Sequence, residues 1–204
     1  MPNDLHAEEI LKLEFEYARE TAAQAQNDRT VIVNLYLLLV GGAGSLLLAA
    51  GSLVPVGRFD IPAQALTVLF GVLGLLGALT LFKLIRLRQA WFDSVRAMNT
   101  IKAYYLQTFP ALEDAFLWQA KSIPARGKAW SITFILSTMV ILLSSTSFAA
   151  AMHLTALRQG DAQIMLDAIV FGLGFGLQLL FYFYELRGTE QNQFTTAQEK
   201  QDGT

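Results

Sequence analysis

The amino-acid sequence predicts an all-α integral membrane protein with four transmembrane helices and helical cytoplasmic extensions. Its 204 residues are 53% hydrophobic and only 16% charged, whereas soluble domains carry about a quarter charged residues. Four apolar segments occur, at residues 31–53, 63–82, 129–152 and 164–184. About twenty residues span a bilayer as a helix. None of the four shows the polar face that a buried helix of a soluble protein would show.

The lysines and arginines predict the orientation. Thirteen of the fifteen lie in residues 1–30, 83–128 and 185–204, and Arg58 and Arg158 lie singly in the short connections. Cytoplasmic segments carry the Lys/Arg excess, so both termini are expected in the cytoplasm. Five segments follow: a cytoplasmic N-terminal helix (1–30), a first transmembrane hairpin (31–82), a cytoplasmic amphipathic helical segment (83–128), a second transmembrane hairpin (129–184) and a disordered cytoplasmic tail (185–204).

Within the N-terminal segment, residues 4–30 are expected to form one helix. Glu8 and Glu9 suit its first turn, where the helix dipole favours negative charge. Ala18, Ala22 and Ala25 recur at helical spacing. The segment has seven acidic and three basic residues, whereas residues 83–109 have one acidic and five basic ones. The two segments are therefore expected to pack against each other.

Residues 83–109 continue the second apolar segment without Gly or Pro until Pro110. One face of the expected helix carries large apolar side chains, which we call the docking stripe: Trp91, Val95, Met98, Ile101 and Tyr105. This stripe either packs against another helix of the same chain or docks a cytoplasmic partner protein.

Small residues recur on the membrane segments. They let membrane helices approach closely, and the expected packing positions are Gly41, Ser45, Gly71, Gly74, Gly172 and Gly176. Gly172 and Gly176 form a GxxxG pair, from which we expect a homo-oligomer. Polar residues of the membrane segments, instead of serving only helix packing, could line a polar path through the membrane. Its expected members are Ser137, Ser144, Gln178 and Asp167.

Catalytic chemistry is not expected. The chain has no Cys and two distant histidines, His6 and His153, and no nucleophile–base or metal constellation is visible. Apart from Asp167, the membrane segments lack the ionisable groups on which pumps and proton-coupled transporters depend. We expect no enzyme, no cofactor and no nucleic-acid partner, because the basic residues lie where lipid headgroups do.

The stretches "EFEYARETAAQAQNDRTVIVNLY" and "LRQAWFDSVRAMNTIKAYYL" flank the first hairpin. Their arrangement resembles that of SLATT-type proteins, small bacterial membrane proteins associated with nucleotide-signalling and defence loci. The resemblance covers residues 5–109, and the second hairpin departs from that two-span plan. It implies a bacterial inner-membrane location and a self-assembling, pore-forming or membrane-perturbing effector that responds to a cytoplasmic signal. The alternative is an accessory subunit that anchors a partner protein through its cytoplasmic helices.

Overall fold

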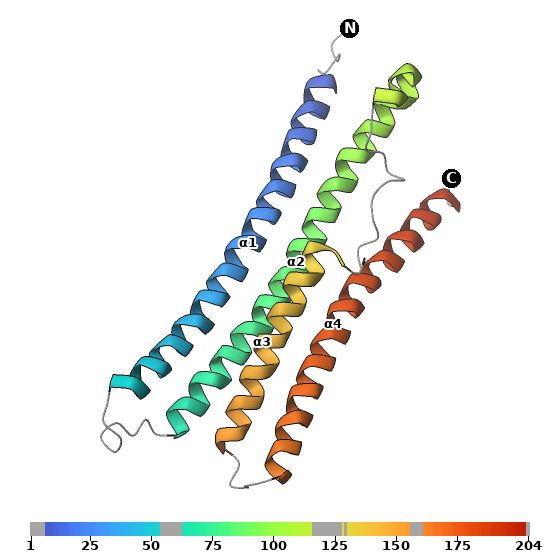
Figure 1. Ribbon diagram of the computed structural model, residues 1–204. Coiled ribbons are helices and arrows are strands. Elements are labelled where there is room, and N and C mark those ends of the chain that lie inside the picture. Colours follow the sequence, from blue (N-terminus) through green and yellow to red (C-terminus); the bar gives the residue numbers. More distant parts are fainter. Residues whose placement is uncertain (1–6, 54–62, 116–127, 129, 156–160, 203–204) are drawn as a thin grey trace.

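The computed structural model describes residues 7–53, 63–115, 128, 130–155 and 161–202, and these residues contain no β-strand. Four α-helices account for most of them: α1 (Ala7–Leu53), α2 (Ala63–Thr108), α3 (Ile132–Thr155) and α4 (Asp161–Asp202), with a short 3-10 helix, η1 (Pro110–Ala115), after α2 (Figure 1). Each of the four α-helices contains a stretch long and apolar enough to cross a membrane. The predicted all-α membrane architecture is confirmed.

The helices α1 and α2 each join a membrane segment to its polar extension without a break. The expected segment boundaries at residues 30 and 82 therefore fall inside continuous helices. No Gly or Pro lies near either boundary, and the extensions are rich in Ala, Gln, Arg and Leu, which favour helix. Pro110 follows the end of α2, where a proline disfavours helical continuation.

The C-terminal segment differs from the expected disordered tail. In the structure α4 continues through to Asp202. Its last part contains Gln, Glu, Ala and Lys and no Pro, and extending an existing helix costs far less than nucleating a new one. The expected amphipathic helical segment over residues 83–128 is described as the end of α2 and as η1, and residues 116–127 lie outside the described residues.

Local signals also start α3. Ser131 directly precedes the helix, and its Oγ accepts a hydrogen bond from the backbone N–H of Phe134 at 3.2 Å. A serine in this N-cap position satisfies a donor that the first turn leaves without a partner. Ser131 therefore fixes where the third apolar helix begins.

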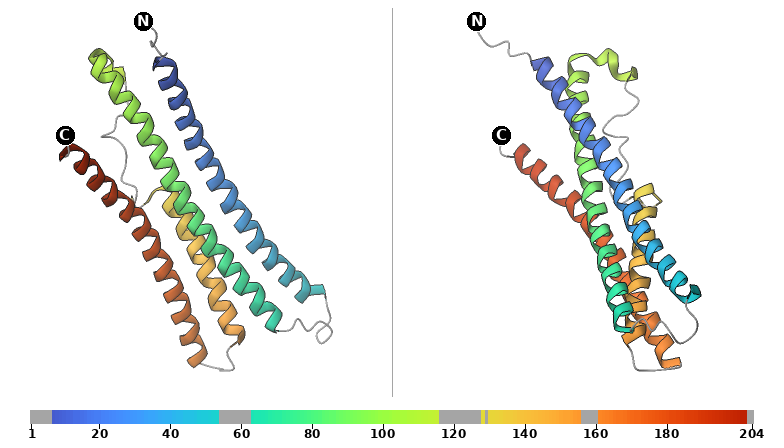
Figure 2. Two further views of the ribbon diagram at one scale, coloured as in Figure 1. Left: turned by 180° about the vertical axis from the view of Figure 1, so that it is seen from behind. Right: turned by 90° about the vertical axis from the view of Figure 1, so that its left-hand side faces the viewer.

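The helices are arranged with α2 and α3 in the centre and α1 and α4 on either side (Figure 1). In the described residues α1 contacts chiefly α2, and no Cα atom of α1 lies within 8 Å of a Cα atom of α4. The start of α1, the end of α2 and the end of α4 lie at one end of the molecule, which we call the extension end. The opposite end, where α1 ends and α2 begins, is the hairpin end. A side view shows α1 crossing α2 obliquely (Figure 2).

All four helices contribute to one buried core: Val33, Tyr36, Leu81, Leu84, Ile85, Val140, Ile141, Tyr182 and Leu186. These residues lie near the junction between the apolar segments and the extensions. Towards the hairpin end α1 loses its cover, since Leu46 and Leu48 are exposed and a Cβ on Gly41 would meet nothing within 4 Å. The four helices are therefore held together chiefly around mid-length, where the apolar segments meet the extensions.

Candidate functional site

Close helix contacts surround two glycines of α2. A Cβ on Gly74 would lie 2.9 Å from the Phe148 ring, and one on Gly77 would lie 2.6 Å from the Cβ of Ser144. The Ser144 hydroxyl donates to the Gly74 carbonyl at 2.8 Å, and the Tyr36 hydroxyl donates to a carbonyl of α2 at 3.3 Å. At these glycines α2 admits side chains from both α1 and α3, as small residues do in membrane helices. The sequence prediction named Gly74 but missed Gly77.

The other predicted packing positions face outwards. A Cβ built on Gly41, Gly71, Gly172 or Gly176 would meet nothing within 4 Å. Ser45 is exposed, and its hydroxyl donates to the Gly41 carbonyl of its own helix at 2.9 Å. Within one chain the structure therefore brings Gly74 into a helix contact and leaves these five residues on its outer surface.

The four residues of the predicted polar path enter separate contacts. Ser144 faces α2, as described above, and Ser137 is buried on α3. Gln178 of α4 donates from Nε2 to the Ser145 hydroxyl at 3.2 Å and to the carbonyl of its own helix at Gly174 at 3.1 Å. Ser145, which the sequence prediction did not include, is therefore the partner of Gln178 between α3 and α4.

Asp167 joins His153 near the tip of the second hairpin. The His153 Nδ1 lies 2.7 Å from Asp167 Oδ2, and Gln163 donates from Nε2 to Asp167 Oδ1 at 3.0 Å. The His153 side chain is 60% exposed and the Asp167 side chain is 25% exposed. Both residues border an open cavity of about 400 Å³ beside Phe70. No group of three His, Cys, Asp or Glu side chains suitable for a metal ion occurs among the described residues.

The docking stripe of α2 lies half-buried in the extension. All five of its residues have intermediate exposure. Here α1 runs beside α2 (Figure 2), and three alanines of α1 are buried, Ala18, Ala22 and Ala25. Ala25 and Trp91 line a common cavity. The other side of α1 exposes three apolar side chains, Ile10, Leu13 and Tyr17. We call them the outer stripe of α1.

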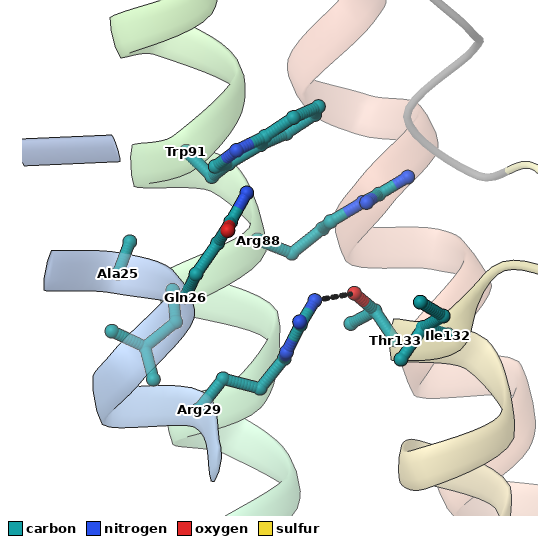
Figure 3. Close-up of a pocket in the computed structure, with 8 residues that line it drawn as sticks. Ala25, Gln26, Arg29, Arg88, Trp91, Ile132 and Thr133 are labelled. Carbon is teal, nitrogen blue, oxygen red and sulfur yellow. Dashed lines mark hydrogen bonds between the residues drawn. The ribbon is translucent and has the colours of Figure 1, made fainter. Parts of the chain in front are cut away.

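At the level of the core, a cavity of about 250 Å³ opens between α1, α2 and α3 (Figure 3). Two arginines from different helices border it, Arg29 of α1 and Arg88 of α2, and Arg29 Nη1 donates to the Thr133 hydroxyl of α3 at 2.8 Å. In the sequence these arginines indicate only the orientation of the chain in the membrane. Their convergence depends on the packing of three helices, which no local sequence signal reveals.

No protein-family model matches the chain, and neither does any curated protein sequence or solved structure.

Proposed function

We propose that this chain is a membrane protein that self-assembles through helix faces left open by its own fold, and that the assembly perturbs the bilayer in response to a cytoplasmic signal. The observation that carries the proposal is the open arrangement of the helices. In the described residues no Cα atom of α1 lies within 8 Å of a Cα atom of α4, so each of these helices presents a face of its apolar segment to its surroundings.

The open face of α4 carries the features of a helix–helix contact. Gly172 and Gly176 have open space around them, and exposed leucines lie beside them, Leu173 and Leu177. Leucines alone would suit lipid contact. A glycine pair one turn apart additionally lets the backbone of a second helix approach, which side chains of ordinary size prevent.

The open face of α1 lies towards the hairpin end. Gly41, Gly42 and Gly44 have nothing within 4 Å of their Cβ positions, and Ser45 is exposed beside them. Because α1 and α4 occupy opposite flanks of α2 and α3, a second copy can pack on either flank. Two such faces per chain support assembly into a ring or an array.

The interior of a single chain argues against a path within the monomer. Ser144 and Gln178 form hydrogen bonds inside the chain, and α3 packs closely on Gly74 and Gly77 of α2. In the proposed assembly any conducting path lies between copies.

The absence of cysteine from the chain provides a direct test. In native membranes under oxidation, Leu173→Cys is expected to form a disulfide-linked dimer, whereas Leu142→Cys, an exposed position on α3, is not. In cells carrying a membrane-potential dye, induced wild-type protein should depolarise the membrane, and Gly172→Leu with Gly176→Leu should abolish this. Equal crosslinking at both positions would reject the α4 interface, and unchanged potential with the wild type would reject the effector role.

A second candidate function, the anchoring of a partner protein, is favoured by the outer stripe of α1. Leu13 is 61% exposed and Tyr17 69% exposed in an extension that lies outside the apolar segment. If the chain is an anchor, Leu13→Asp with Tyr17→Asp should release a co-purifying protein without altering membrane insertion. If the co-purifying proteins are the same as in the wild type, this stripe does not anchor them.

A further inference from the structure

We propose that the cavity between Arg29 and Arg88 binds a phosphate group, carried by an anionic phospholipid headgroup or by a soluble phosphate compound. This inference is independent of self-assembly. It rests on the position, charge and hydrogen-bonding capacity of the two arginines.

The two guanidinium groups lie close together without a negative partner. Figure 3 shows both side chains directed into the space between α1, α2 and α3. Among the described residues no carboxylate forms an ion pair with either arginine. Burial lowers the pKa of Arg88, which lies beyond the apolar part of α2, and Arg29 contributes to the same direction, while Tyr182 opposes it. Two neighbouring cations that are partly withdrawn from water favour an anion between them.

Both arginines also retain donors for a ligand. The Nε of each is covered and has no hydrogen-bond partner within the described part of the chain, so a ligand in the cavity would meet the terminal Nη groups. Arg29 is held on one side by its bond to Thr133, which is buried. The Arg88 guanidinium lies 5.2 Å from the centroid of the Trp91 ring and 4.9 Å from that of Phe92. Thr133 and the two rings therefore hold the two guanidinium groups in fixed orientations. The N–H donors of a guanidinium group form a planar fork that matches the spacing of phosphate oxygens.

The place of the cavity suits phosphate from either source. Arg29 lies two residues before the apolar segment of α1, Arg88 lies six residues after that of α2, and Thr133 lies in the first turn of α3. The cavity therefore lies at the depth of lipid headgroups, where anionic lipids attract Arg and Lys. Its volume of about 250 Å³ exceeds what a water molecule needs and accommodates a phosphate group. The exposed Gln26 amide at its edge adds a further polar group.

The test compares two double variants of the full chain in phosphatidylcholine nanodiscs. Arg29→Gln with Arg88→Gln removes both cavity charges. Lys83→Gln with Arg86→Gln removes two exposed charges of α2 at a similar level and is the matched control. In one arm the nanodiscs contain increasing fractions of phosphatidylglycerol. In the other, phosphatidylcholine nanodiscs receive sodium phosphate, compared with sodium chloride at equal ionic strength. The thermal midpoint of unfolding is followed in each.

The wild type and the control should gain thermal stability in at least one arm, and the cavity variant should not. Loss of a charge-assisted bidentate contact is expected to weaken binding on the order of tenfold or more. A response only to phosphatidylglycerol identifies a lipid ligand, and a response to phosphate identifies a soluble one. No response of the wild type in either arm, or equal losses in both double variants, would overturn the proposal.

Arg88→Lys keeps the test decisive if the cavity variant does not fold. Lysine preserves the charge but loses the planar fork. For Arg88→Lys, the amount of phosphatidylglycerol or phosphate that gives half of the full stabilisation should rise severalfold, in the arm to which the wild type responds. Wild-type affinity in this variant would overturn the assignment of Arg88 to the site.

Discussion

The middle and the hairpin end of the helix bundle are held together very differently. Around mid-length all four helices contribute to one core, which includes Tyr36 and Tyr182. Towards the hairpin end α1 exposes glycines and leucines, and α4 exposes Gly172. In water such exposure would be costly, but in lipid it is not, because the hydrophobic effect does not act between membrane helices. Internal packing therefore has to come from close contacts and hydrogen bonds, and these are concentrated around Gly74 and Gly77.

The largest effect is expected at Gly77. Gly77→Val places side-chain atoms against the Tyr36 hydroxyl and Ser144, so α1 or α3 must move away from α2. Overpacking of this kind costs about 1–3 kcal/mol or more. Gly71→Val is the matched control on the same helix, because a Cβ there meets nothing within 4 Å. Thermal unfolding in detergent should show a clear loss for Gly77→Val and little change for Gly71→Val. Equal midpoints would mean that the contact around Gly77 does not hold the helices together.

The next effect concerns the extension, where α1 runs beside α2 and is expected to pack on the docking stripe. Val95 and Met98 are half-buried. Full burial of such a side chain is favourable by roughly 1.5–3 kcal/mol, so each of these two contributes part of that free energy. Val95→Asp with Met98→Asp should detach the first part of α1 and make it several times more sensitive to limited proteolysis. Leu13→Asp, on the exposed outer stripe, is the control and should leave cleavage unchanged. Similar cleavage rates in all three proteins would show that the stripe does not hold α1.

The fold was largely predictable from the sequence, whereas the contacts were not. Helix periodicity identifies the face of α4 that carries Gly172 and Gly176, but not whether another helix of the chain covers that face. Gly77 was missed for the converse reason: its importance comes from Tyr36 and Ser144, which lie on two other helices. Packing order is a property of the assembled helices, and no local pattern encodes it.

Some contacts within a hairpin could have been predicted. His153 and Asp167 lie at equal distances along the chain from Gly160, and Ser145 and Gln178 lie almost symmetrically about the same residue. In an antiparallel pair of helices such residues lie at the same depth. The proximity of Arg29 and Arg88 is harder to predict, because their cavity is also lined by Thr133 of the second hairpin. Only the docking of one hairpin on the other brings these three residues together.

A smaller effect is expected from the hydrogen bond that joins α3 to α2. Ser144 is fully buried, and its bond to the Gly74 carbonyl measures 2.8 Å. Hydrogen bonds between membrane helices contribute about 0.6 kcal/mol on average and up to about 1.7 kcal/mol. Ser144→Ala should reduce stability by an amount in this range. Thr146→Val, which removes an exposed hydroxyl bonded within its own helix, should have less effect, and the opposite ranking would contradict the assigned contact.

The smallest effect is expected at the tip of the second hairpin, between His153 and Asp167. Their atoms lie 2.7 Å apart, but His153 is 60% exposed, and exposed ion pairs contribute only about 0.2–1 kcal/mol. Asp167→Asn removes the charge and keeps an oxygen that can accept the bond from Gln163. His153→Gln removes the other partner. A double-mutant cycle measured by unfolding in detergent should give a coupling energy within that range.

The control cycle uses Asp161, an exposed acidic residue at the start of α4. Asp161→Asn replaces Asp167→Asn there and should show no coupling with His153→Gln. Equal coupling in both cycles would mean that His153 responds to the general negative charge of this tip, and that the contact with Asp167 does not join α3 to α4.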